Sequence, residues 1–419
     1  MLSDEVIEKV IERLVNRIEQ GNEYVLEQIG KSIKKIGTLT PSKAQELVQI
    51  LKYGGDYDKI VKKLAEITKL NVRDIKKIFE EVAKHDYEFA KQFYDFRGKK
   101  FIPYGQNIAL KQQIDAISSM TAKKYVELAR SDAIGFGMVD KKTKEVVFKG
   151  LKDAYNEVLD EAILNVGQGK ETFDSAMFRQ LKQMGTGLKV IYENGRTMRL
   201  DSAIRMHMKD AIRTLHNETQ TIIGKEFDSD GVEITVHENP APDHQDVQGK
   251  QFSTNQYDEN GKLIKKGEFE KFQSDEKAVS YDGVEFDPKF EGHDRRSISQ
   301  YNCYHYTFAI VLGVSKPEYS NKELKEIIDN NNKGFDYEGK HYTMYEGTQL
   351  QRQIERAIRE QKDTQILARA SDNEMLIGES QQKITMLNHK YKELSKASGL
   401  LEKKDRLRVS GYKRVAIKK

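Results

Sequence analysis

The sequence predicts a mainly α-helical protein with a small α+β subdomain near residues 228–315. Apolar residues recur at helical spacing through most of the chain, and only 6 of its 419 residues are proline. The pattern changes at residue 231, where Val232, Ile234 and Val236 alternate as in a strand and a turn rich in proline and aspartate follows. We therefore expect helices on both sides of one strand-containing region.

Composition excludes several classes of protein. There are 70 lysines and arginines against 66 aspartates and glutamates, a net charge of +4, so bulk charge does not require a nucleic-acid partner. The single cysteine rules out an intrachain disulfide and fits synthesis in a reducing compartment. The chain lacks a run of 18 apolar residues and a signal-peptide pattern, so no membrane partner is expected.

Residues 1–97 are predicted to form a series of short helices. Gly21 and Asn22 are interpreted as the end of the first helix, and Thr40-Pro41 as the start of the third. Pairs of short helices occur in DNA-binding modules, but they are also a general way to bury amphipathic faces. The predicted helices span about 3–20, 25–37, 41–53, 58–69 and 71–97.

The next segment is predicted to be helical with glycine-rich interruptions. Residues 98–110 have the composition of a loop. A long helical stretch is expected over about 107–165, with a break near Gly135-Phe136-Gly137. Residues 141–150 fit either a short hairpin or the start of a helix.

Two features precede the strand-containing region. The string GQGKET at 167–172 lacks the spacing of a phosphate-binding loop and indicates a turn before a new helix. Residues 200–227 carry an apolar stripe at helical spacing, which predicts an amphipathic helix with Asp201 as its N-cap.

From residue 253 to 295 the chain is polar and rich in glycine and aspartate, which predicts loops and short hairpins. A compact apolar run follows at 301–312. The expected domains are 1–110, 111–227, 228–315 and 316–419. Helices are predicted at 322–335, 343–371 and 378–396, followed by a basic tail at 404–419.

The last third has the clearest charge pattern. Arg352, Arg356, Arg359 and Lys362 recur at steps of three or four, which predicts a solvated helix with salt bridges between its turns. The basic tail could contact DNA phosphates or an acidic protein surface, and a phosphate contact and a simple role in solubility fit it equally well.

Four side chains between residues 231 and 313 have metal-ligand chemistry: His237, His244, Cys303 and His305. Thiolate and imidazole suit zinc, and a structural zinc site uses four such ligands. The spacing matches no common zinc signature, so a buried cysteine with hydrogen-bonded histidines is the alternative.

Two catalytic interpretations are weaker. Cys303 lies in the apolar run YNCYHYTFAIVL, which favours a buried, inert thiol over a nucleophile. A nuclease-type metal site would need clustered carboxylates, but aspartates in a polar loop region are mostly turn formers. The carboxylates concerned are Asp243, Asp246, Asp287 and Asp294.

The string VEITVHENPAPDHQDVQGKQFS, followed by HDRRSISQYNCYHYTFAIVLG, resembles the phage minor capsid protein 2 family, which is related to the Mu-type head-morphogenesis proteins. The resemblance covers about 115–415 and is most specific at DHQDVQG (243–249) and NCYH (302–305). Many members have the string A-R-P-x-H, whereas this chain has Ala241-Pro242-Asp243-His244, which is one residue shorter. The matched positions are Arg205, Met206, His244, Gln248, Gly249, Asn302, Cys303 and His305, and the resemblance assigns none of them a catalytic role.

The resemblance implies a non-enzymatic, low-copy virion component of the phage head at the portal vertex, made in the host cytoplasm. Such proteins act in head assembly and in packaging or delivery of DNA. The implied partners are the portal protein, scaffold or major capsid protein, and double-stranded DNA through the basic tail. We expect His244, Cys303 and His305 to order the loop-rich subdomain, through a structural Zn²⁺ or through a polar network with Gln248 and Asn302.

Two other functions stay open at this point. One is a metal-dependent hydrolase or nuclease that uses His244, Cys303 and His305. The other is a DNA-binding assembly factor that uses the N-terminal helix pairs.

Overall fold

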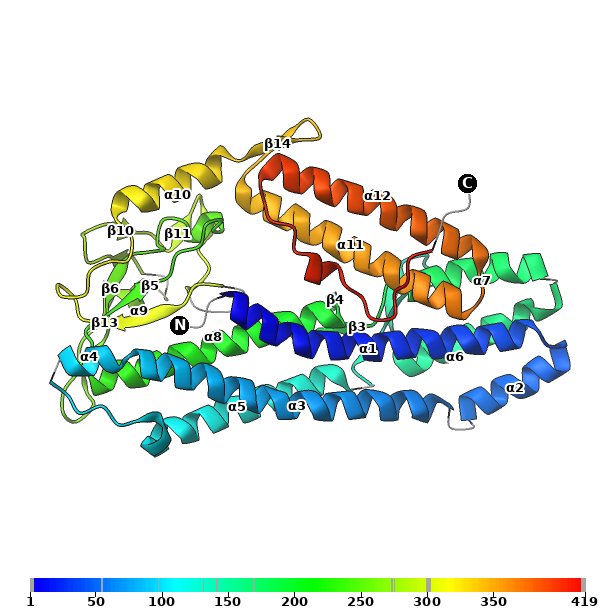
Figure 1. The fold of residues 1–419 in the computed structure, drawn as a ribbon, viewed down its shortest axis with the longest axis horizontal. Coiled ribbons are helices and arrows are strands. Elements are labelled where there is room, and N and C mark those ends of the chain that lie inside the picture. Colours follow the sequence, from blue (N-terminus) through cyan, green and yellow to red (C-terminus); the bar gives the residue numbers. More distant parts are fainter. Residues whose placement is uncertain are drawn as a thin grey trace. The chain divides into compact units, whose positions relative to one another are not determined.

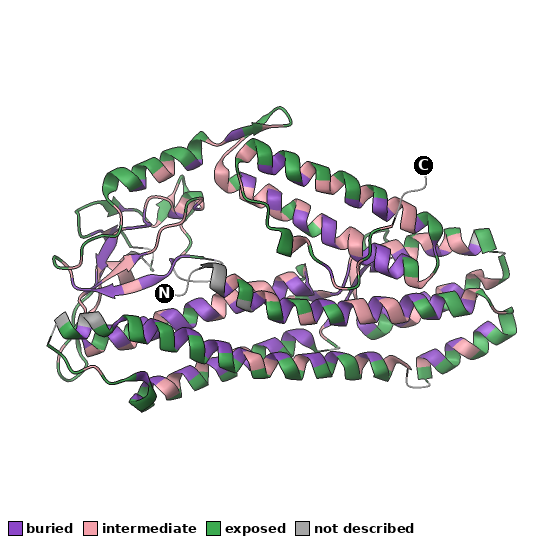
Figure 2. Cartoon of the chain, in the orientation of Figure 1, coloured by how far each residue is buried: buried purple, intermediate pink, exposed green. Residues whose placement is uncertain are grey.

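The computed structural model describes residues 4–53, 56–96, 98–130, 132–140, 142–168, 170–272, 274, 276–298 and 303–415. Helices make up 61% of the structure and strands 12%, in small sheets, so the predicted mainly α fold with a small α+β part is confirmed. Figure 1 shows the elements, and Figure 2 shows how far their residues are buried.

The chain forms two compact units, each built from three separate segments. Unit 1 contains Met1–Glu8, Ile75–Thr121 and Met206–Gln349, and unit 2 contains Lys9–Asp74, Ala122–Arg205 and Leu350–Lys419. Several helices contain residues of both units. The expected division into four consecutive domains stays a prediction.

Unit 2 combines long helices with a four-stranded antiparallel sheet of order β2-β1-β3-β4. Its elements, some shared with unit 1, are α1 (Asp4–Gly37), α2 (Pro41–Tyr53), α3 (Asp56–Phe89), α5 (Ile108–Ala129), β1 (Ile134–Val139), β2 (Val146–Gly150), α6 (Leu151–Asn165), η2 (Val166–Gln168), α7 (Lys170–Met184), β3 (Lys189–Ile191), β4 (Thr197–Arg199), α8 (Leu200–Glu226), α11 (Met344–Ala370), α12 (Glu374–Ser398) and η4 (Lys404–Leu407).

Helix α1 runs without a break through Gly21 and Asn22, so the predicted helix end there is wrong. A Cβ at Gly21 would lie 3.1 Å from Leu64 Cδ2 of α3, so glycine lets the two helices approach closely. Asn22 is buried and hydrogen-bonded within unit 2. Local stop signals are overridden here because tertiary packing uses both residues inside the helix.

Helix α3 is also continuous, and the predicted break after residue 69 is wrong. Asn71 is fully buried, and its Nδ2 donates to the carbonyl of Leu14 at 3.1 Å and to the hydroxyl of Tyr125 at 2.5 Å. Arg17 donates to Asn71 Oδ1 at 3.1 Å. The side chain of Asn71 therefore joins α1, α3 and α5 within unit 2 instead of ending a helix.

The predicted helical stretch over 107–165 contains a β-hairpin between two helices. Gly135 and Gly137 lie in β1, and β2 pairs with it, so the hairpin interpretation of 141–150 is the correct one. A Cβ at Gly135 would lie 1.9 Å from the carbonyl oxygen of Lys149, so this close pairing requires glycine. These glycines mark close strand packing, which their sequence pattern alone does not distinguish from a helix break.

Unit 1 holds the small sheets. The predicted strand at 231 is confirmed as β5, the middle strand of an antiparallel sheet of order β13-β5-β6. The other elements of this unit are α4 (Lys91–Phe96), η1 (Tyr104–Gln106), β5 (Gly231–Ile234), η3 (Pro242–His244), β6 (Gln251–Ser253), β7 (Gln256–Tyr257), β8 (Leu263–Lys265), α9 (Glu268–Phe272), β9 (Ala278–Val279), β10 (Glu285–Phe286), β11 (Lys289–Phe290), β12 (His293–Asp294), β13 (Thr307–Ile310), α10 (Asn321–Lys333), β14 (Phe335–Tyr337) and β15 (Lys340–Tyr342).

The loops and short hairpins predicted between residues 253 and 295 are confirmed as β7 to β12. Ala278 and Phe286 of this region contribute to a small apolar core that is shared with the flanking segments. The buried members are Ile234, Val247, Phe252, Ala278, Phe286 and Ile298.

Helices α10, α11 and α12 lie close to their predicted positions. The prediction that α11 is a solvated helix is wrong, because Glu355, Arg359 and Asp363 on it are buried. Tyr391 of α12 donates to Glu355 at 3.0 Å, so α11 and α12 pack side by side, as Figure 1 shows.

Candidate metal centre and buried ion network

Three of the predicted metal ligands converge in unit 1. His244 ends η3, and Cys303 and His305 lie just before β13. Their side chains are 2–3% exposed, and one ligand atom from each lies within 4.8 Å of the others. Cys303 Sγ lies 3.6 Å from His244 Nδ1 and 3.5 Å from His305 Nδ1.

Hydrogen bonds define the tautomer of His244. Its Nε2 lies 2.8 Å from the carbonyl oxygen of Arg296. A carbonyl only accepts, so Nε2 carries the proton in the neutral ring. The lone pair of Nδ1 therefore points toward Cys303 Sγ.

The same reasoning applies to His305. Oε1 of Gln248 accepts the backbone N–H of His237 at 2.9 Å, which fixes the orientation of the buried amide. His305 Nε2 lies 3.3 Å from the same oxygen and must donate to it. His305 thus also directs an Nδ1 lone pair toward the sulfur of Cys303.

The surroundings favour neutral imidazoles. Burial lowers the pKa of His305 well below its ordinary value, and the neighbouring rings of His237 and His244 act in the same direction. Burial also lowers the pKa of His244, although Asp243 opposes this shift. Neutral rings are the form in which histidine binds a metal ion.

The other residues that the sequence singled out are not part of this three-residue cluster. His237 donates from Nε2 to the carbonyl of Tyr304 at 2.7 Å, and its ring centroid lies 4.6 Å from that of His305, beside the cluster. Arg205 is ion-paired with Glu12 at 2.6 Å in unit 2. Asn302 lies outside the described residues.

The acidic alternative does not assemble among the described residues, where His244, Cys303 and His305 form the grouping with metal-ligand geometry. Asp243 instead accepts two hydrogen bonds from the guanidinium of Arg296, at 2.7 and 2.6 Å. Asp246 is held in the same bidentate way by Arg295, at 2.6 and 2.9 Å. The two arginines also attach the segment before Cys303 to η3.

Gly249, in the first motif, has a φ of +69°, in the left-handed region that favours glycine. A Cβ there would also lie 2.5 Å from Leu324 Cδ2. We expect Gly249→Ala to lower the free energy of unfolding by about 2 kcal/mol, measured by urea titration. Gly261→Ala is the matched control, because its φ is +77° with nothing within 4 Å. Equal losses of stability in both variants would show that the contact with Leu324 contributes nothing.

Two buried polar residues of α8 hold this region and were not among the predicted site residues. Arg213 donates to the carbonyl of Cys303, and His216 contacts Asp86 at 2.6 Å and the carbonyl of Thr307 at 3.1 Å. Neither residue lies on the apolar stripe of α8, so the helical pattern gave no signal of their burial.

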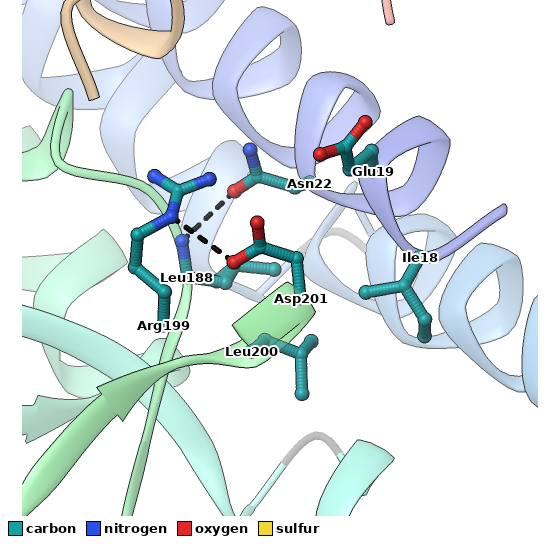
Figure 3. Close-up of a pocket in the computed structure, with 7 residues that line it drawn as sticks. All are labelled: Ile18, Glu19, Asn22, Leu188, Arg199, Leu200 and Asp201. Carbon is teal, nitrogen blue, oxygen red and sulfur yellow. Dashed lines mark hydrogen bonds and ion pairs between the residues drawn. The ribbon is translucent and has the colours of Figure 1, made fainter. Parts of the chain in front are cut away.

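The sequence pattern also gave no indication of a buried ion network in unit 2, of which Figure 3 shows Arg199 and Asp201. Asp201 is the second residue of α8 and not its cap. It pairs with Arg199 at 3.0 Å and with Arg359 at 2.9 Å, and Arg199 pairs with Asp363 at 2.7 Å. All four side chains are at most 7% exposed. Two arginines therefore balance two aspartates.

Helix α1 completes this network. Asn22 donates to Asp363 at 3.0 Å and accepts the backbone N–H of Leu188 at 2.8 Å. Glu19 of the same helix is buried and lines the same small pocket as Asn22, Arg199 and Asp201 (Figure 3). Burial raises the pKa of Glu19 to about 8, and the negative charge of Asp201 acts in the same direction.

The described part of the basic tail is attached to unit 2. Arg359 donates to the carbonyl of Arg406 at 2.7 Å, Lys362 donates to the carbonyl of Leu407, and Ser410 donates to Glu23 at 2.6 Å. The tail backbone is thus fixed, while the side chains of Lys404, Arg408 and Lys413 are exposed.

Comparison with known proteins identifies the family. The family model described as "Phage minor capsid protein 2" matches residues 2–395. Neither the search of curated proteins nor the search of solved structures found a significant match. None of the helices in the described part of the chain is long and apolar enough to cross a membrane. Because the family model covers nearly the whole sequence, this chain belongs to the phage minor capsid protein 2 family.

Proposed function

We propose that this minor capsid protein is a low-copy, non-enzymatic component of the portal vertex that acts in head assembly and in packaging or delivery of DNA. The family match over residues 2–395 carries the proposal. The portal protein is the proposed main partner, with scaffold or major capsid protein as further contacts. The site of action would be the virion, after synthesis in the host cytoplasm.

Two structural observations favour this role over the alternatives. The side chains of His244, Cys303 and His305 are 2–3% exposed, whereas a hydrolytic metal site needs a position that substrate can reach. The N-terminal region contains two 34-residue helices, α1 and α3, where the sequence predicted a series of short helices, and this makes a helix-turn-helix module a less direct interpretation.

Purified virions test the proposed role directly. We expect quantitative mass spectrometry to find this chain in far fewer copies than the major capsid protein. We also expect the full-length chain to co-elute with portal protein in size-exclusion chromatography. Absence from virions, or failure to bind portal while binding major capsid protein stoichiometrically, would contradict the portal-vertex assignment.

A separate prediction concerns DNA. Exposed cations on a fixed backbone suit phosphate contacts, so replacing Lys404, Arg408 and Lys413 by glutamine is expected to weaken binding to duplex DNA. The slope of log affinity against log salt should fall by about 1 for each phosphate that the variant no longer neutralises. Fluorescence anisotropy at several salt concentrations measures both quantities.

The control removes the same charge elsewhere, by glutamine at the exposed Lys62, Lys69 and Lys123. Equal weakening in both triple variants would indicate a net-charge effect and exclude a specific role of the tail.

A further inference from the structure

We infer that His244, Cys303 and His305 form a zinc site, with His244 Nδ1, Cys303 Sγ and His305 Nδ1 as its ligands. The donor set matches the ion, because zinc binds imidazole nitrogen and thiolate sulfur. The site lies outside any activity proposed above and concerns how the subdomain in unit 1 is held together.

The distances fit three corners of a tetrahedral zinc site, whose fourth corner would be left to a water molecule. Zinc–sulfur bonds of about 2.3 Å and zinc–nitrogen bonds of about 2.0–2.1 Å place sulfur and nitrogen about 3.5–3.6 Å apart at the tetrahedral angle. Cys303 Sγ lies 3.6 Å from His244 Nδ1 and 3.5 Å from His305 Nδ1. Both separations agree with one shared ion.

Counting protons favours the ion over hydrogen bonds alone. Both rings use their N–H groups at Nε2, so both direct Nδ1 lone pairs at one sulfur. A thiol carries a single proton and can donate it to one of these nitrogens at a time. A cation accepts both lone pairs and the thiolate together.

The outer contacts are also those of a metal site. Histidine ligands usually donate their second ring N–H to a carbonyl or carboxylate, which orients the ring. Here the carbonyl of Arg296 accepts from His244, and the amide oxygen of Gln248 accepts from His305. Gln248 is in turn fixed by the backbone N–H of His237.

The position of the ligands indicates what the ion does. His244 and Cys303 are 59 residues apart and stand at the two ends of the segment that contains β6 to β12. An ion bound to both ends closes this long, loop-rich segment, and its binding free energy contributes to folding.

The experiment uses the full-length wild-type chain, purified without chelator. We expect elemental analysis to find about one zinc per chain. After removal of zinc, Co²⁺ should restore one equivalent of metal and give a thiolate-to-cobalt charge-transfer band together with the visible bands of tetrahedral Co²⁺. A natively folded wild type that contains no zinc and takes up no Co²⁺ with this band would overturn the inference.

Variants identify the ligands. C303S should lose the charge-transfer band, and His244→Gln and His305→Gln should lose stoichiometric binding. Gln248→Leu removes an outer contact only, so zinc affinity should fall about 10–100-fold while the band remains. His293→Gln, at an exposed histidine of β12, is the matched control and should bind as wild type does. Loss of the ion in His237→Gln would contradict the three-residue ligand set. Whether the chain binds zinc at all is decided by the wild-type titration, even if a ligand variant fails to fold.

Discussion

Replacing Arg359 by alanine is expected to lower the free energy of unfolding by about 3–5 kcal/mol, because it leaves two buried carboxylates, Asp201 and Asp363, with Arg199 as their one arginine partner in the network. Arg359 is ion-paired with Asp201 and donates to the carbonyl of Arg406. Asp201 would keep one of its two arginines, in a place where its side chain is 5% exposed. Urea unfolding followed by circular dichroism measures the change.

Arg356→Ala is the matched control, since Arg356 lies one turn earlier on α11 and is exposed. Its effect should stay within about 0.5 kcal/mol. If both variants unfold at the same urea concentration, the buried network does not stabilise unit 2 as argued.

Glu19→Gln is expected to make stability less dependent on pH. Burial, reinforced by Asp201, raises the pKa of Glu19 from 4.5 to about 8 in the folded protein. Between these pH values the folded state holds a proton that the unfolded state releases, so this group lowers stability as pH rises from 4.5 to 8. Glutamine has no such proton. As pH rises over this range, the free energy of unfolding of the variant should therefore increase by about 2–5 kcal/mol relative to that of the wild type.

The charges around Glu19 support a loss of stability when its carboxyl group ionises. Arg199 and Arg359 are already balanced by Asp201 and Asp363, so ionising Glu19 adds an uncompensated negative charge to a buried site. Thermal or urea unfolding at pH 5 and pH 9 measures the difference. Glu27→Gln on the same helix should change stability by less than about 0.5 kcal/mol at both pH values. Parallel profiles for Glu19→Gln and wild type would show that Glu19 is ionised in the folded chain.

Sequence alone was sufficient where the signal is local and repeated. The apolar stripe of residues 200–227 predicted α8, and the alternation from Val232 predicted β5. The motif strings around His244 and Cys303 indicated the family that the whole-chain match then showed. The sequence also named the three side chains that converge, because their chemistry is uncommon in one short segment.

Tertiary structure decided the features that depend on partners distant in the chain. Gly21 and Asn22 look like a helix end, but α3 and Asp363 make them interior positions of α1. Gly135 looks like a helix break, but it faces the carbonyl of Lys149 across a hairpin.

The sequence likewise does not reveal which charged residues are buried together. Arg359 and Asp363 have the spacing of a solvated helix, and only the burial of their partners Arg199 and Asp201 reveals a network. The separations between Cys303 and the two histidines likewise arise from packing, because the segments that meet are 59 residues apart. A residue's type and spacing therefore determined which secondary structure and which chemistry were available in this chain. Long-range packing determined which of them were used, because burial and hydrogen-bond partners come from the whole fold.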